Sequence, residues 1–501
     1  MRRRRFGAMM RRGILALAGG LLLAGAMPDP KFVVLIEEMA RLSDRGDVAA
    51  VLKKLDAGLA TYVDPGSERG LLLGLRAAAL EDMDKPAEAL ADIDQAVAMV
   101  PDEPDIRFRQ ATLQRSVGKN ADAARTMIFI ADAFPDELAG LNIRWVGSLI
   151  RDLDGDKNMQ FELAMALASR GYDLADQPGR VDWIVAYAIL GLIERDRDDE
   201  ARALVPRLID TSTIIEMMID RRYESLWPAL EAKAGPQART ALAAERAAIE
   251  AAWRRDPGNI ERTADYANSL QAAGRPLDAV NLGAPLVADM AKIAQQGEPG
   301  FWLVNAQAQA LASAGRVDEA DALFRKLLAL GLEKHPDLIS MAINHSSMLL
   351  DEGRTASALE AADALDALEP GYMSDYGRMW VWETQACANA ALGRAEPTAA
   401  ALAKLQGKQD QNVDAALLAL LCADKLDDAE LILLKRLADP DKRGAVLTAL
   451  QDFEPAAPDP FADAMRAKLL ALRDRPAVRK AIEAEGRILT IAAPHSHWAG
   501  L

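Results

Sequence analysis

Cysteine and histidine are scarce in this chain, which has two Cys and four His among 501 residues. Cys387 and Cys422 lie in separate Ala- and Leu-rich stretches and form no CxxC pair, so neither a zinc centre nor a redox motif is expected. Alternating runs of Val, Ile and Thr bounded by glycine are also scarce, which argues against a β-sheet protein. Ala, Leu, Glu, Arg and Asp fill nearly every segment, and this composition favours an all-α fold.

Catalytic motifs are lacking as well. No glycine-rich phosphate-binding loop occurs, and neither His335 nor His345 has a neighbouring Ser, Cys or Asp arranged as a nucleophile and its base. His495 and His497 stand two residues apart without an accompanying Cys or acidic cluster, so we expect a mobile tail there rather than a metal site. The sequence therefore predicts a protein that is not an enzyme and holds no cofactor or metal.

One acidic stretch begins like a calcium-binding loop, with Asp152, Asp154 and Asp156 at alternating positions. However, Lys157 stands where the loop needs glycine for its sharp turn, and Leu163 stands where it needs a bidentate Glu. A solvated acidic connection between two helices is the favoured interpretation.

The N-terminal segment, residues 1–26, reads "MRRRRFGAMMRRGILALAGGLLLAGA" and has six Arg, no acidic residue and a short apolar core. It ends in Ala-Gly-Ala, which has the form of a signal-peptidase site, so a secretory signal peptide is predicted. A membrane span needs about 20 apolar residues, and the apolar stretch here is shorter. Cleavage of the signal and export to the bacterial periplasm are therefore favoured. An uncleaved anchor in the inner membrane, facing the periplasm, is the alternative. The paired arginines leave both the general secretory and the twin-arginine route open.

Acidic residues outnumber basic ones, 75 Asp and Glu against 59 Lys and Arg, for a formal net charge of −16. Residues 1–26 contain six of the basic residues and none of the acidic ones, so their removal lowers the net charge to −22. Such a chain repels phosphate backbones, and nucleic acid is not an expected partner. Membrane contact is expected only through the N-terminal segment. For Cys387 and Cys422, buried thiols are favoured over a disulfide, because free Cys is among the most buried residue types.

A pattern of helical hairpins recurs along the chain, and residues 301–331 show it most clearly. Ala308 and Ala320 provide small residues where the two helices cross, and Phe324 supplies bulk. Gly315 ends the first helix, where a left-handed conformation is easiest for glycine. A similar unit spans residues 69–101, and the next one ends 34 residues later at Pro135.

This recurring pattern of helical hairpins resembles the tetratricopeptide-repeat (TPR) family, whose repeats have a period of 34 residues. The resemblance covers about half of the chain in six or seven units, and it implies a right-handed α-solenoid of stacked helix-turn-helix repeats. An Ala-rich bundle of unrelated hairpins is the alternative. The hinge glycines Gly274, Gly315, Gly353 and Gly393 are 41, 38 and 40 residues apart, so the C-terminal units exceed the minimal length.

The pattern predicts five segments. They are a signal peptide (1–26), N-terminal TPR-like repeats (27–140), an irregular helical segment (141–250), C-terminal TPR-like repeats (251–440), and terminal helices with a mobile tail (441–501). For the irregular segment, diverged repeats are favoured over a joint between two repeat blocks.

The resemblance also implies a function, because stacked hairpins of this family bind peptides or partner helices on a concave face lined by the first helix of each unit. Counting from the hinge glycines predicts that this face carries Asn268, Trp302, Asn305, Gln309, Asn344, Trp380 and Glu383. The family's clamp for a terminal carboxylate is not expected, since Ala264, Asn305 and Ile343 occupy the corresponding places without the lysine.

We therefore expect an exported scaffold or adaptor that binds a protein or peptide of unknown identity. A ligand-binding or enzymatic site in the segment 141–250, framed by the repeats, is the alternative, and so is the same adaptor tethered by its N-terminal helix. The sequence indicates no oligomeric state.

Overall fold

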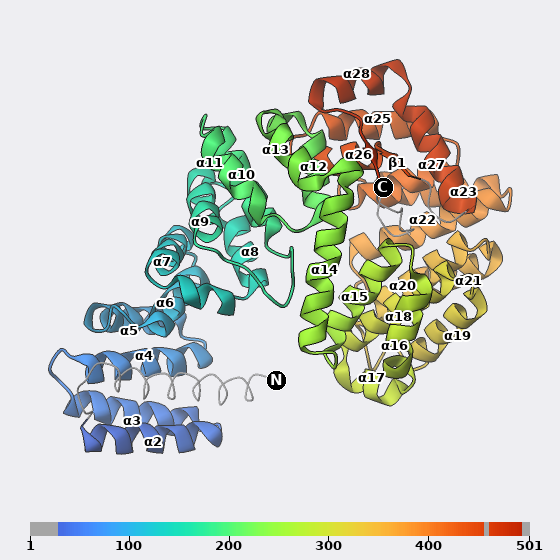
Figure 1. Ribbon diagram of the computed structural model, residues 1–501. Helices are drawn as coiled ribbons and strands as arrows, with labels where there is room; N and C mark the ends of the chain where they lie inside the picture. Colours follow the sequence, from blue (N-terminus) through green and yellow to red (C-terminus); the bar gives the residue numbers. More distant parts are fainter. Residues whose placement is uncertain (1–28, 455–459, 493–501) are drawn as a thin grey trace. The chain divides into compact units, whose positions relative to one another are not determined.

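The structure is a computed structural model that describes residues 29–454 and 460–492. The chain forms two compact units, of which unit 1 ends at Asp173 and unit 2 begins at Leu174. Both consist of helices joined by short turns (Figure 1), which confirms the predicted all-α solenoid of helical hairpins. The segment 141–250 thus contributes to both units. The proposed signal peptide, His495 and His497 lie outside the described residues. Among the described helices, none has the length and apolarity to cross a membrane.

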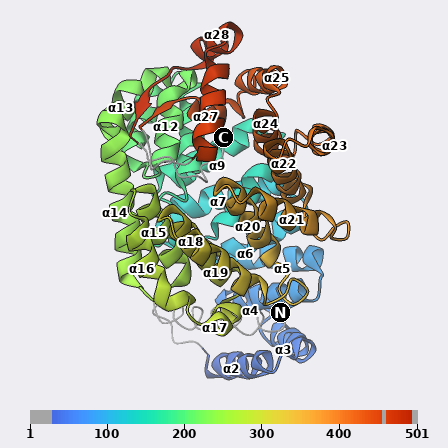
Figure 2. The same cartoon turned by 90° about the vertical axis from the view of Figure 1, so that its right-hand side faces the viewer.

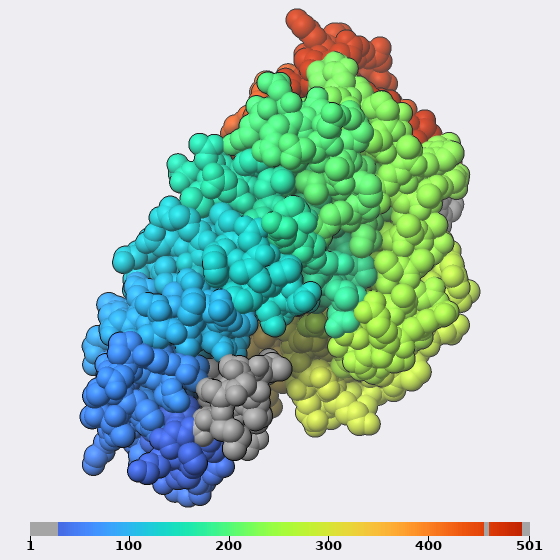
Figure 3. Space-filling model, turned by 60° about the vertical axis from the view of Figure 1, so that its left-hand side comes forward, coloured from blue at the N-terminus to red at the C-terminus, as the bar shows by residue number. Residues whose placement is uncertain are grey.

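Unit 1 is a succession of hairpins in which each helix packs mainly on its neighbours in the sequence. On the surface its colour therefore passes in order from blue to cyan (Figure 3). Its helices are α2 (Pro30–Asp44), α3 (Val48–Thr61), α4 (Ser67–Asp82), α5 (Pro86–Met99), α6 (Pro104–Ser116), α7 (Asn120–Ala133), η1 (Pro135–Gly140), α8 (Ile143–Asp152) and α9 (Lys157–Ser169).

The helices of unit 1 start where the sequence supplies a suitable first residue. Pro86 and Pro104 occupy the first position of α5 and α6, where the missing N–H costs no helical hydrogen bond. Leu55, Leu72 and Ile93, which are fully buried, join successive hairpins into one apolar core.

Unit 2 begins with a less regular set of helices: α10 (Asp182–Ile193), α11 (Asp198–Leu204), η2 (Val205–Arg207), α12 (Thr211–Ile219), η3 (Arg221–Leu226), α13 (Trp227–Ala234), η4 (Pro236–Ala238) and α14 (Arg239–Arg255). Regular hairpins follow: α15 (Ile260–Ala272), α16 (Pro276–Val287), α17 (Met290–Gln296), α18 (Glu298–Ser313), α19 (Val317–Leu328), α20 (Leu338–Asp351), α21 (Thr355–Asp366), α22 (Asp375–Ala391), α23 (Ala395–Gln406), α24 (Val413–Cys422) and α25 (Leu426–Leu437). The unit ends with α26 (Arg443–Ala449), β1 (Asp452–Phe453), α27 (Pro460–Arg473), α28 (Pro476–Glu485) and β2 (Thr490–Ile491).

The predicted packing of the hairpin 301–331 is confirmed. Ala308, Ala320 and Phe324 are fully buried between α18 and α19. The hinge Gly315 has φ +74°, and Gly274, Gly353 and Gly393 have φ values of +69°, +70° and +71°. A left-handed residue ends each of these first helices, so the next helix can fold back on it.

Aspartate takes the same role at three hinges that lack glycine. Asp84, Asp196 and Asp424 have φ values of 63°, 57° and 55°, and they connect α4 to α5, α10 to α11 and α24 to α25. Asp is one of the few residues with a side chain that visits this region readily. Hairpins with the same hinge geometry therefore also occur in segments that have no hinge glycine.

The C-terminal elements of unit 2 return to its first helices. α26 packs on α12, α28 packs on η3, and β2 pairs in parallel with β1 (Figure 1). Asp220 and Gly486 form an isolated antiparallel bridge, and a Cβ on Gly486 would lie 2.4 Å from the carbonyl oxygen of Ile219. Glycine is therefore required at this close approach of two backbones.

Candidate functional site

The first helices of the C-terminal hairpins, α15, α18, α20, α22 and α24, contact one another in succession. The second helices α16, α19, α21 and α23 each also contact the first helix of the next hairpin. We call the surface of the five first helices that faces away from the second helices the first-helix face. It is the surface that the sequence analysis predicts to bind a partner.

The residues predicted for this face differ in their accessibility. Asn268 is exposed, Trp302 is 43% exposed, and Gln309 is half-buried. They lie on the adjacent helices α15 and α18. Trp302 donates its indole N–H to Glu298 on the same helix, 3.4 Å away, and otherwise presents a large apolar surface to solvent.

The other predicted residues lie deeper. Asn305 is 5% exposed and accepts a hydrogen bond of 2.9 Å from Asn344 on the next first helix, so this pair joins α18 to α20. Trp380 packs partly against the core between α20 and α21, with Tyr376 edge-on at 6.4 Å. Glu383 is 2% exposed. A partner on the unaltered surface cannot reach Asn305 or Glu383.

Helix α27 covers part of the first-helix face, a feature that the sequence analysis missed. It contacts α20 and α24 (Figure 2), and Phe461 packs against the apolar cluster that runs through the C-terminal hairpins from α15 to α22. The sequence of α27 is amphipathic like that of many surface helices, so nothing local indicates where it docks.

Several cationic side chains hold α27 in place. Arg466 donates to the backbone carbonyls of Ala449 and Gln451. Arg473 donates to the Leu450 carbonyl at 3.1 Å and to Asp452 at 2.6 Å. In the part of the chain that the structure describes, α27 covers the face at α20 and α24, whereas Asn268 on α15 and Trp302 on α18 are exposed; we call these two helices the open part of the face.

The predicted buried thiols are wrong, because Cys387 and Cys422 form a disulfide with a Cα–Cα distance of 5.0 Å. It joins α22 to α24 next to α27. The two residues are 35 positions apart, about one repeat, so adjacent first helices bring them to the same level. That spacing was the available signal in the sequence.

Glu383 lies one helical turn before Cys387, and its Oε1 is 3.1 Å from the Cys387 sulfur. The Thr384 hydroxyl donates to Oε2 at 3.3 Å. Burial raises the pKa of Glu383 to about 8, because removal from water disfavours the charged carboxylate. A disulfide sulfur has no proton to donate, so the protonated carboxyl is the donor in the contact with Cys387.

The acidic stretch of unit 1 uses its carboxylates within the protein. Asp152 is paired with Arg115 at 2.8 Å, and Asp154 is paired with Lys157 at 2.8 Å. Asp156 caps α9 by accepting from the backbone N–H of Met159. The arrangement is that of an acidic connection between α8 and α9, as favoured from the sequence.

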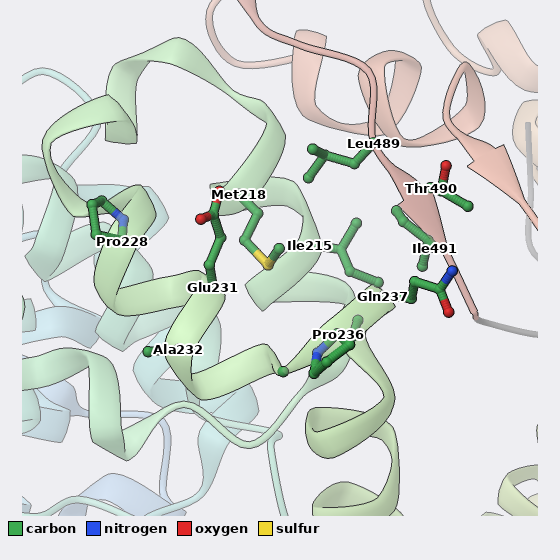
Figure 4. A pocket seen from close by; sticks show the side chains of 12 residues that line it. Ile215, Met218, Pro228, Glu231, Ala232, Pro236, Gln237, Leu489, Thr490 and Ile491 are labelled. Atoms are coloured by element: carbon green, nitrogen blue, oxygen red, sulfur yellow. The ribbon is translucent and has the colours of Figure 1, made fainter.

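A pocket of about 670 Å³ lies between α12, α13, η4 and β2 (Figure 4). Ile215 and Met218 face Leu489 and Ile491 across it, and Glu231 provides a carboxylate at its edge. This is a predominantly apolar lining, and part of it comes from the segment 141–250 that the alternative hypothesis singled out.

The wall of this pocket contains a strained backbone. Gly235, Gln237 and Ala238 have φ values of 69°, 54° and 62°, and a left-handed conformation costs about 1–2 kcal/mol at a residue with a Cβ. The N–H of Ala492, next to β2, donates to the Gln237 carbonyl at 2.9 Å and helps to hold this conformation.

Charged groups near the pocket are paired. Arg487 forms an ion pair of 2.7 Å with Glu231, and its guanidinium lies 3.9 Å from the centre of the Trp227 ring. Arg487 also donates to the Met218 carbonyl at 2.7 Å. These contacts link the C-terminal segment to α12 and α13.

No protein-family model and no curated protein matches this chain. Among solved structures, yeast Tom70 is 11% identical, with a TM-score of 0.33, over 91% of this chain and 100% of that chain. A structure of Naa15/Naa10 bound to HypK-THB is 12% identical, with a TM-score of 0.30, over 95% of this chain and 82% of that one. Scores of this size are too low to transfer any property. The helical hairpins themselves define the fold as a TPR-like α-solenoid.

Proposed function

We propose that this protein is an exported helical-repeat scaffold that binds a protein or peptide partner, without catalysis. The proposed contact surface is the open part of the first-helix face, on α15 and α18. The observation that supports it is Trp302, a large aromatic side chain that is 43% exposed. Asn268, which is exposed, and Gln309, which is partly buried, provide amides for hydrogen bonds on the same two helices.

Trp302 suits an interaction anchor because binding energy concentrates in a few residues, among which Trp is enriched. Hydrophobic side chains are also exposed on the second helices. Leu277 on α16 is 58% exposed, although it lies away from the first-helix face. It provides a control for the loss of any exposed apolar group.

The test is an in-cell cross-linking pull-down that compares wild type, Trp302→Ala and Leu277→Ala, with folding checked by circular dichroism. We expect one partner that is captured by wild type and Leu277→Ala. Its affinity for Trp302→Ala should fall roughly 30-fold, the equivalent of about 2 kcal/mol at a hot spot. Equal capture by all three proteins would overturn the assignment of the surface.

Export is supported by the N-terminal sequence and by the Cys387–Cys422 disulfide, since disulfides persist mainly in oxidising compartments. The mass of the chain isolated from fractionated cells tests this step. A mature protein that begins after residue 26 supports a cleaved signal peptide. A full-length, membrane-bound chain supports the tethered form instead.

The pocket of unit 2 supports a second candidate function, the binding of a small apolar ligand. The supporting observation is the strained backbone at Gln237 and Ala238, because strain of this kind gathers at functional sites. Ile215→Trp should narrow the pocket and weaken binding of the apolar fluorescent probe anilinonaphthalene sulfonate. Leu431→Trp, at an exposed position on α25, is the matched control. Equal probe binding by the two variants would contradict this candidate.

A further inference from the structure

Three sulfur atoms and a carboxyl group meet where α27 covers the first-helix face. The Met465 Sδ on α27 lies 3.7 Å from the Cys422 Sγ on α24. Ligand atoms of Glu383, Cys387 and Cys422 all lie within 4.8 Å of one another. These groups come from three separate helices, and we call them the sulfur cluster.

Most of the sulfur cluster is shielded from water, and only Cys422 is partly accessible. Cys387 and Glu383 are each 2% exposed, and Met465 is 9% exposed. Buried carboxyl groups are usually paired with a cation, whereas the Glu383 oxygens contact only the Thr384 hydroxyl and the Cys387 sulfur in the interactions seen for it. The carboxyl is thus directed at the Cys387 sulfur.

We propose that the sulfur cluster is a copper(I) site when its disulfide is reduced, with the Cys387 and Cys422 thiolates and the Met465 thioether as ligands. Soft thiolate and thioether ligands select Cu(I), whereas hard cations require oxygen ligands. Glu383 does not bind the metal but donates a hydrogen bond to the Cys387 sulfur. This site is independent of partner binding at Trp302.

Reduction and metal binding are separate steps. Two thiols of an external dithiol supply two electrons and two protons, which convert the Cys387–Cys422 disulfide into two thiols, and the dithiol becomes a disulfide. Binding of one Cu(I) ion then releases the two thiol protons to water. Met465 already lies beside Cys422, so its thioether is in place for the second step, the binding of the metal.

The test uses the full chain, reduced with dithiothreitol and desalted without oxygen, and titrated with Cu(I) held by the chromogenic chelator bicinchoninate. We expect reduced wild type to withdraw one equivalent of Cu(I), and the oxidised protein to withdraw none. Cys387→Ser and Cys422→Ser should each bind at least tenfold more weakly. Met465→Leu, which conserves volume and so the fold, should weaken binding about tenfold or more without a change in circular dichroism.

Glu383→Gln tests whether Glu383 donates a hydrogen bond to the Cys387 sulfur, as proposed, or binds the metal itself. The amide is also a neutral donor, so Cu(I) affinity should stay within about threefold of wild type. A parallel titration with Zn²⁺ tests a harder ion. Preference for Zn²⁺ together with its loss in Glu383→Gln would overturn the copper assignment. Equal Cu(I) binding by reduced wild type and Met465→Leu, or none by reduced wild type, would also overturn it.

Discussion

The buried carboxyl of Glu383 should make the stability of this protein fall as pH rises. In the unfolded chain its pKa is near 4.5, and in the fold burial raises the pKa to about 8. Between these values the folded state binds more protons than the unfolded state, so the free energy of unfolding decreases with increasing pH. The contribution is fully present below pH 4.5 and is lost as pH rises through 8.

The size of the effect follows from the two pKa values. Each unit of difference corresponds to about 1.4 kcal/mol. Between pH 5 and pH 8 the contribution of Glu383 to the free energy of unfolding should therefore fall by roughly 3 to 4 kcal/mol. Glu383→Gln cannot ionise and keeps a similar shape, so this part of the pH dependence should vanish in the variant.

The assay is urea unfolding of the full chain, followed by circular dichroism at several pH values from 5 to 8, for wild type and Glu383→Gln. All other titrating groups are common to the two proteins, so the difference between their curves isolates Glu383. We expect Glu383→Gln to gain stability relative to wild type as pH rises. Parallel curves would refute the burial of an uncompensated carboxyl at this position.

Two further predictions concern the contacts that hold the hairpins together. Arg76→Ala removes the partner of Asp92, which is 3% exposed and bound by Arg76 at 2.7 and 2.8 Å, so the free energy of unfolding in urea should fall by about 3 kcal/mol. Arg125→Ala breaks the exposed ion pair with Asp122 and should lower it by under about 0.5 kcal/mol. Equal losses in the two variants would contradict the difference in burial. Cys422→Ser opens a loop of 35 residues, so the free energy of unfolding under non-reducing conditions should fall by about 3–4 kcal/mol. An unchanged midpoint of urea unfolding would show that the disulfide does not restrict the unfolded chain.

The fold could be predicted because its signals are local. The signals act within one hairpin, as in residues 301–331. They are a glycine that ends the first helix, small residues where the two helices cross, and a carboxylate in the first turn of the second helix. Asp84, Asp196 and Asp424 extend the same hinge geometry with another residue type. Their hairpins, α4–α5, α10–α11 and α24–α25, are therefore less visible to a search based on glycine.

The candidate site could be predicted only in part from the sequence, because the exposure of its residues depends on segments that are distant in the chain. Counting from hinge glycines gives the position of a residue on its helix, but it cannot show that Asn305 pairs with Asn344 across two hairpins. It also cannot show that α27 packs on helices more than 35 residues earlier in the chain. The docking of α27 and the meeting of Cys387 with Cys422 depend on the stacked fold as a whole.

Site-specific photo-cross-linking in cells tests most directly whether the first-helix face binds a partner. A photoreactive amino acid is placed at Gln309 or Asn268 on the open part of the face, and at Leu431 on the second helix α25 as the control. We predict that one protein cross-links from Gln309 and Asn268 and not from Leu431. A partner that cross-links only from Leu431, or equally from all three positions, would contradict the account.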